Sequence, residues 1–245
     1  MRPLTPHEFL HVWERGETEH PLDRALTLLA PACPELTRKQ LASLSIGQRD
    51  ALLLALREKT FGRNIQASAD CPQCRNRLEF ALNLADFQLS TVEEHPQGSE
   101  FSFTIGGLSV RARFPNSLDL ASVAGYQDVS AARKVLARRC VLELRDSDRE
   151  IGSEELPEQV ISALSRQIAN RDPASEIELD LRCSECGHRW HALFDILAFL
   201  WIEISAYAQR LLGEIHTLAR AYGWNENEIM ALSARRRQLY IQMVT

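Results

Sequence analysis

Two stretches of this 245-residue chain carry the same pattern, DCPQCRNRLEFALNLADF at residues 70–87 and LRCSECGHRWHALFDILAFLW at residues 181–201. Each has a CxxC pair followed by an apolar run, and together they hold four of the six cysteines. A shift of 112 residues superimposes both pairs and several apolar positions. The matching positions are Ile65 with Ile177, Cys71 with Cys183, Cys74 with Cys186, Leu78 with Trp190, Leu82 with Phe194, Leu84 with Ile196 and Phe87 with Phe199. The repeat predicts a unit of strand, CxxC knuckle and returning strand that occurs twice.

Two such units facing each other would present four thiolates to one tetrahedral Zn²⁺, the ligand set of a closed structural site. The predicted ligands of this structural zinc are Cys71, Cys74, Cys183 and Cys186. Closing the long loop between Cys74 and Cys183 costs about 4 kcal/mol of chain entropy. Structural zinc sites in small peptides return about 10–16 kcal/mol of apparent binding energy. Zinc can therefore staple two hairpins that are distant in the sequence.

Other interpretations of the cysteines stay open. One or both pairs could be reduced thiols in strand turns, or a redox dithiol, although a redox CxxC usually precedes a helix in a thioredoxin-like unit. His188 or His191 could replace a cysteine as ligand, although four thiolates already complete the shell. Cys33 and Cys140 lie among apolar helical neighbours, and we expect both in the core.

The composition indicates a folded, acidic protein whose partners are proteins. Hydrophobic residues make up 45% of the chain, the formal net charge is -5 and the pI is near 5.8, so strong nucleic-acid binding is not expected. No signal peptide is visible, and the longest apolar stretch, residues 194–204, is short for a membrane span and contains Asp195 and Glu203. We therefore expect a cytoplasmic, soluble protein without a membrane span.

The sequence contains no catalytic signature. It has no Gly-rich phosphate loop, no GxSxG and no HExxH. A zinc ion held by four cysteines also leaves no open position for a water molecule or a substrate. We therefore predict that the protein is not an enzyme, has no catalytic residues and binds no small-molecule substrate.

The periodicity predicts an α+β fold that is mainly helical, with β-hairpins and a split four-cysteine site resembling a zinc ribbon. Thr5, Thr37 and Ser45 are each followed three residues later by Glu or Gln, the pattern of a capped helix start. Alternating apolar residues predict a hairpin over residues 101–114. Further helices are expected from a capping Ser117, from Ser130 to Cys140, from Pro157 to Ala169, from Trp201 to Tyr222 and from about Ser233.

These elements divide the chain into five segments, with exposed loops expected at residues 91–100 and 146–155. The segments are an N-terminal helical region (1–62), a first zinc-knuckle hairpin (63–90), an inserted hairpin with helices (91–172), a second zinc-knuckle hairpin (173–200) and C-terminal helices (201–245).

The C-terminal end is a candidate partner surface. Its last segment places apolar anchors beside arginines, a composition common at protein interfaces. The candidate residues are Arg235, Arg236, Arg237, Leu239, Tyr240 and Met243. We hypothesise that this end docks an acidic surface of another subunit, although a terminal helix folded back onto its own domain would have the same composition.

Five stretches carry a resemblance to a known family: ALREKTFG, CPQC, VRARFPNSLDLASVA, CSECGHRWHALFDILAFLW and LARAYGWNENEIMALSARRRQLYIQMV. In them the chain resembles the T4-type baseplate hub assembly proteins of contractile phage tails and related contractile injection systems. The resemblance implies a non-enzymatic structural component or assembly factor whose partners are other baseplate or tail proteins, in a phage-tail-like particle assembled in the cytoplasm. A transient chaperone and a permanent subunit are both compatible with it.

A zinc-ribbon nucleic-acid-binding protein is the alternative. Such a ribbon is expected to interleave basic and aromatic residues around its knuckles. Here four arginines near the knuckles are almost balanced by four carboxylates: Arg75, Arg77, Arg182 and Arg189 against Asp70, Glu79, Asp180 and Glu185. This balance favours the structural or assembly interpretation.

Overall fold

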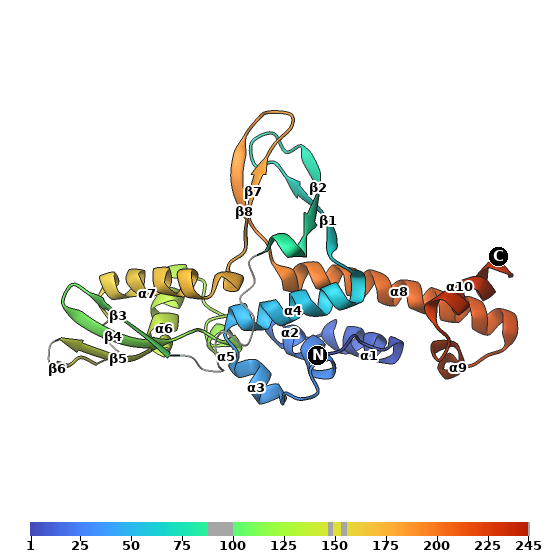
Figure 1. Cartoon of the computed structure of the whole chain (residues 1–245), viewed down its shortest axis with the longest axis horizontal. Helices are drawn as coiled ribbons and strands as arrows, with labels where there is room; N and C mark the ends of the chain where they lie inside the picture. Colours follow the sequence, from blue (N-terminus) through green and yellow to red (C-terminus); the bar gives the residue numbers. More distant parts are fainter. Residues whose placement is uncertain (88–99, 147–148, 153–155, 245) are drawn as a thin grey trace.

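The computed structural model describes residues 1–87, 100–146, 149–152 and 156–244. Figure 1 shows an elongated molecule with two hairpins rising from a helical body, a small sheet with helices at one end, and a long helix reaching the other end. The chain is an α+β protein, as predicted, because helices alternate with small antiparallel sheets. The five-segment division stays a prediction.

Four helices open the chain: α1 (Pro6–Gly16), α2 (Pro21–Ala32), α3 (Arg38–Ser43) and α4 (Ile46–Phe61). The capping boxes predicted at Thr5, Thr37 and Ser45 are confirmed, because each hydroxyl accepts the N–H of the residue three positions on. The Glu or Gln side chain at that position accepts the N–H of the cap residue in return. The sequence pattern missed α2. Its N-cap is His20, which is not one of the common capping residues.

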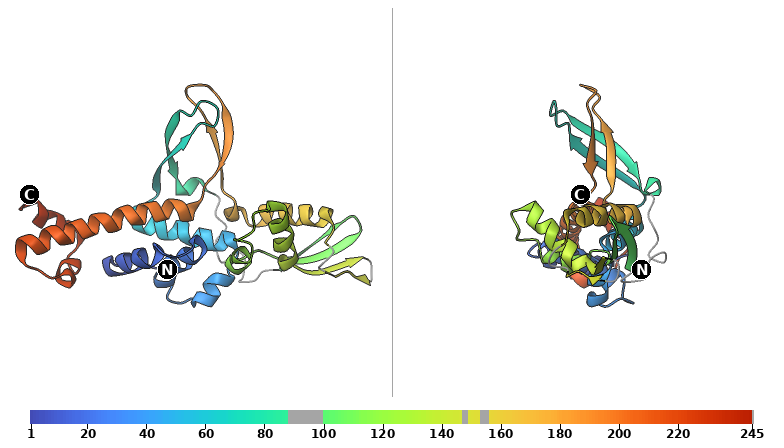
Figure 2. Two further views of the ribbon diagram at one scale, coloured as in Figure 1. Left: turned by 180° about the vertical axis from the view of Figure 1, so that it is seen from behind. Right: turned by 90° about the vertical axis from the view of Figure 1, so that its left-hand side faces the viewer.

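Two hairpins of similar design contain the CxxC pairs at their turns. They are β1 (Asn64–Asp70) with β2 (Arg77–Asn83), and β7 (Glu178–Arg182) with β8 (Arg189–Leu193). Helix α4 leads into β1 and β8 leads into the long helix α8 (Ile196–Tyr222), whereas β2 is followed by the short 3-10 helix η1 (Leu84–Asp86). The two hairpins stand side by side in both directions of view (Figures 1 and 2). We call β1–β2 and β7–β8 the hairpin pair.

Alternation along its four strands gives the hairpin pair an apolar side and a polar side. The buried and half-buried apolar side chains are Ile65, Ala67, Ala69, Leu78, Phe80, Leu82, Leu179, Leu181, Trp190 and Ala192. The two hairpins are separate two-stranded sheets, each paired only within itself in the described chain. At the base, Ile65 belongs to the core of the helical body, whereas the cysteines lie at the opposite end of the strands.

The hairpin predicted over residues 101–114 is confirmed as β3 (Glu100–Ile105) and β4 (Leu108–Arg113), but the sheet is larger. Strands β5 (Val141–Asp146) and β6 (Arg149–Glu150) extend it in the order β3-β4-β5-β6. The prediction of a loop at residues 146–155 was wrong in part, because β6 lies within it. Most of the loop expected at residues 91–100 lies outside the described residues. With α5 (Ser117–Ala121), α6 (Val129–Cys140), α7 (Glu158–Arg171) and the 3-10 helix η3 (Pro173–Ser175), the strands form what we call the sheet lobe.

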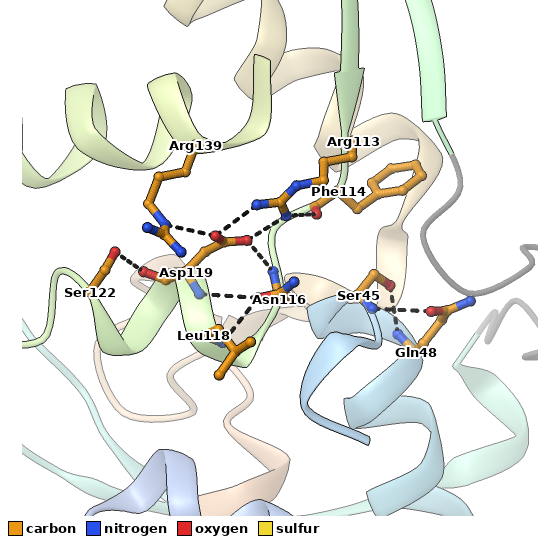
Figure 3. Close-up of polar contacts among 9 residues, drawn as sticks. All are labelled: Ser45, Gln48, Arg113, Phe114, Asn116, Leu118, Asp119, Ser122 and Arg139. Carbon is orange, nitrogen blue, oxygen red and sulfur yellow. Dashed lines mark hydrogen bonds and ion pairs between the residues drawn. The ribbon is translucent and has the colours of Figure 1, made fainter. Parts of the chain in front are cut away.

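One buried carboxylate joins three elements of the sheet lobe. Asn116, and not the predicted Ser117, caps α5 by accepting two N–H groups at 3.0 and 3.1 Å. Asp119 is fully buried and accepts the Asn116 N–H at 3.0 Å. Its oxygens also accept from Arg113 at 2.6 and 2.9 Å and from Arg139 at 2.8 Å (Figure 3). The carboxylate thereby ties α5 to β4 and α6.

The sheet lobe meets the helical body at the start of α4. The Ile46 N–H donates to the carbonyl of Pro115 at 3.1 Å, and the Gly47 N–H donates to the carboxylate of Asp172 at 3.0 Å. A Cβ on Gly47 would lie 1.9 Å from Asp172 Oδ1. Glycine is therefore required for this close approach.

Helix α8 connects the helical body to the C-terminal helices. Ile204 belongs to the core of the helical body, and Ala208, one turn later, belongs to a second cluster with α9 (Glu226–Met230). Two hydrogen bonds of 2.9 and 2.8 Å from Arg57 to Glu203 tie α4 to it. The last helix, α10 (Ala234–Gln242), packs back along its distal half (Figure 1).

Helix α8 begins earlier than predicted, and it is longer and more apolar than the sequence analysis indicated. The helix begins at Ile196, before the predicted Trp201, because Asp195 caps it by accepting the Ala198 N–H at 3.0 Å. By length and composition alone it is also the one described helix that could cross a membrane. One third (33%) of the apolar segment of this helix is buried within the protein. The absence of a membrane span stays a prediction.

Candidate metal centre

Each CxxC pair forms the same turn. In the first turn the N–H of Cys71 donates to the carbonyl of Asn76 at 2.9 Å, and the N–H of Arg75 donates to the carbonyl of Cys71 at 2.8 Å. The equivalent bonds of the second turn, from Cys183 to His188 and from Gly187 to Cys183, measure 2.9 and 3.0 Å. The predicted repeat therefore holds at the level of single hydrogen bonds.

The equivalence continues beyond the cysteines. Arg75 and Gly187 occupy the same position of the turn, and both have left-handed backbones with φ of 60° and 72°. Asn83 and Asp195 are also equivalent, since each caps the helix that follows its hairpin. These two caps were missed in the sequence, although the shift of the repeat aligns them.

The two turns bring the four cysteine sulfur atoms together. The Sγ atoms of Cys71 and Cys186 are 3.7 Å apart, those of Cys74 and Cys183 are 3.6 Å apart, and all four lie within 4.8 Å of one another. Zinc–sulfur bonds of about 2.3 Å in a tetrahedron place the sulfur atoms about 3.8 Å apart. The group is therefore of the right size to hold one metal ion.

Burial and charge differ within this group. Cys71 and Cys183 are buried, whereas Cys74 and Cys186 are exposed. A backbone hydrogen bond from Cys186, supported by one from Glu185, lowers the pKa of Cys183 to about 7. For Cys74 the backbone hydrogen bond from Asn76 favours the thiolate, but desolvation and the neighbouring thiols outweigh it and raise the pKa to about 12.

Four thiolates this close would repel one another, because like charges disfavour each other's ionised form. A cation at their centre would remove this repulsion, and thiolates are the ligands preferred by zinc and other soft metals. A metal held by all four sulfur atoms would have a closed shell, which serves structure rather than catalysis. The residues thus fit a structural metal ion.

The remaining cysteines and the candidate histidines lie apart from this group. In the described chain, the four cysteines form the one group of three or more His, Cys, Asp or Glu side chains close enough to share an ion. His188 stacks on Trp190, with ring centroids 6.0 Å apart, and His191 is exposed on the outer face. Cys33 and Cys140 are buried in apolar cores, as predicted.

The six candidate partner residues do not share one surface. Arg237 is 2% exposed, and its guanidinium donates to Glu214 of α8 and to the carbonyl of Leu232, both at 2.8 Å. Tyr240 packs against Tyr222 and Trp224. Four residues remain exposed: Arg235, Arg236, Leu239 and Met243. Including Arg237 in the surface is therefore corrected, because this arginine holds α10 against α8.

The fold and this site define a class of protein, a helical scaffold with two hairpins that meet at four thiols able to hold a metal ion. The chain belongs to the family of the T4 bacteriophage base plate protein, whose family model matches residues 7–201. Comparisons with curated proteins and with solved structures gave no match. Membership confirms the baseplate part of the resemblance and indicates a structural role in a phage tail particle, among other baseplate or tail proteins. The match ends within α8.

Proposed function

We propose that this protein is a zinc-stapled component or assembly factor of the baseplate hub in a contractile tail or contractile injection system. The observation that carries the proposal is the four-thiol group, found in a chain of a baseplate family. Zinc held by Cys71, Cys74, Cys183 and Cys186 would fix the tips of the two hairpins, and with them α4 and α8, in one arrangement. The protein acts by presenting surfaces and has no enzymatic step.

The alternative, a zinc ribbon that binds nucleic acid, has less support. The outer faces of the hairpin pair expose basic residues, but acidic residues lie between them. On β7, for example, Glu178 and Asp180 precede Arg182, and all three are exposed. A phosphate backbone would meet no continuous basic face there.

Metal analysis of the purified protein tests the zinc staple. Protein prepared without chelator should contain about one zinc per chain, and the four thiols should resist titration until a chelator removes the metal. Metal-free protein with four freely titratable thiols would contradict the proposal.

Purified mature particles decide between a permanent subunit and a transient factor. A permanent subunit would remain in the particle, whereas an assembly factor would be present only in incomplete baseplates. The exposed part of the C-terminal surface is tested in the same experiment with Arg235→Glu/Arg236→Glu, which should lose partners if this surface docks an acidic neighbour. The matched control is Arg182→Glu/Arg189→Glu, an equal charge change on the outer face of the second hairpin. Equal partner retention by both double variants would place the docking surface elsewhere.

A further inference from the structure

A groove crosses the junction of the sheet lobe and the helical body. One cavity of about 390 Å³ lies between α6 and α7, and a second of about 500 Å³ lies between α2, α4 and the start of α8. Pro115, Leu120, Ser175 and Glu176 line both cavities. Because they share these residues, the two cavities are neighbours, and we call them together the groove.

The walls of the groove are mainly apolar. Helix α6 contributes Ala132 and Leu136, and α7 contributes Leu164 and Ile168. The ends carry two of the most exposed large apolar side chains of the described protein, Val129 at 80% and Leu193 at 67%, and an apolar face of this kind marks an interaction site.

The charged groups of the groove are mainly carboxylates. Arg49 is neutralised by Asp50 at 2.7 Å, and Arg133 donates to Glu158 at 3.4 Å. Glu176, which faces both cavities, and Asp195, at the second, leave an excess of negative charge.

Asp50, which lines the second cavity, is affected by the neighbouring carboxylates. Burial raises the pKa of Asp50, and the carboxylates of Asp195 and Asp172 add to the rise against the opposing effect of Arg49. A cationic side chain placed here would relieve this repulsion.

We infer that this groove binds an amphipathic helix of another baseplate protein, with its apolar face between α6 and α7 and a lysine or arginine near Glu176 and Asp195. The inference rests on the proposed function, because that function supplies the class of partner. A helix satisfies its own backbone hydrogen bonds, whereas an extended segment would need donors and acceptors that these mainly apolar walls lack.

The test uses two labelled peptides of about 15 residues that form amphipathic helices, one of leucine and lysine and one of leucine and glutamate. The zinc-loaded full chain should bind the lysine peptide at least tenfold more tightly than the glutamate peptide. Ala132→Trp, which fills the groove, should weaken the lysine peptide at least tenfold, whereas Ala206→Trp on the exposed side of α8 should not. Glu176→Lys should reduce the preference for the lysine peptide severalfold, and Glu178→Lys, on the outer face of β7, should leave it unchanged.

Val129→Ser tests the groove without disturbing the core, since Val129 is mostly exposed and the variant is expected to fold. It should weaken the lysine peptide severalfold. Equal affinity of wild type for both peptides, or unchanged binding by Ala132→Trp and Val129→Ser, would overturn the inference. All groove variants keep the four cysteines, so zinc content and presence in baseplates report on the proposed function separately.

Discussion

The hairpin pair and the sheet lobe are both built from antiparallel strands, but their interiors differ. In the sheet lobe, Val110, Ala112 and Leu144 are almost completely buried in a core shared with α6 and α7. Within the strands of the hairpin pair, only Ile65 and Leu181 are buried, and the other inward side chains keep partial contact with water. Since a two-stranded hairpin is marginally stable in water by itself, the pair needs a second means of support.

The two regions are therefore stabilised by different interactions. The sheet lobe buries an apolar core between its strands and helices and adds the Asp119 network. The hairpin pair is anchored to a core at its base and has four thiols at its tip. If the thiols hold zinc, removal of the metal should loosen the hairpin pair and spare the sheet lobe.

The largest expected effect is that of Cys183→Ser. The variant should lose its zinc and several kcal/mol of stability, because structural zinc sites return about 10–16 kcal/mol. Hydrogen exchange should accelerate in β1, β2, β7 and β8 and stay slow in β3–β5. Ser184→Ala, at the next residue, is the control and should keep its zinc. Uniform acceleration in both regions would contradict the comparison.

The reverse experiment weakens the sheet lobe with Asp119→Asn. The substitution leaves Arg113 and Arg139 without their charge partner and should cost about 3 kcal/mol, the lower end for a broken buried ion pair, because both arginines retain access to water. Faster exchange should be confined to β4, α5 and α6, with zinc content unchanged. Asp128→Asn is the control, because Asp128 caps α6 and an asparagine at this position can cap the helix equally well.

We also expect the stability difference between wild type and Asp119→Asn to depend on pH. Burial raises the pKa of Asp119, but hydrogen bonds from Arg113, Asn116 and Arg139 outweigh it and lower the pKa below its usual value of 3.8. The carboxylate therefore stabilises the fold above that value, and its contribution is lost as the pH falls through the lowered pKa. The stability difference between wild type and Asp119→Asn should shrink below pH 3.8. A difference that grew on acidification would show that the network does not act through the carboxylate.

The smallest effect is expected from exchanging residues between the equivalent turn positions of the two knuckles. Arg75 has a left-handed backbone that costs a non-glycine residue about 1 kcal/mol, whereas Gly187 adopts it freely. Arg75→Gly should tighten zinc binding by up to about fivefold and Gly187→Arg should weaken it by about fivefold. No atom lies within 4 Å of a Cβ on Gly187, so the backbone alone sets this cost.

A competition titration against a chelator measures both affinities. The double variant Arg75→Gly/Gly187→Arg should bind zinc nearly as wild type does. Effects of the same sign from both single substitutions would show that the two knuckles are not equivalent.

Features that depend on a few neighbouring residues could be predicted from the sequence. The repeat predicted both hairpins and the equivalence of Cys71 with Cys183, and three capping boxes predicted three helix starts. These signals are local because a turn or a cap is made by hydrogen bonds within a few residues. Where the local signal was weak, as at the His20 cap of α2, or absent, as for β5, the sequence missed the element.

Features that depend on contacts between distant elements became visible in the three-dimensional structure. Three neighbouring arginines look alike in the sequence, yet Arg237 is buried against Glu214 while Arg235 and Arg236 stay exposed. The groove between α6 and α7 likewise depends on how these two helices pack against each other. Periodicity shows that a face is apolar, but burial depends on which other face it meets, and that is fixed by packing over the whole chain.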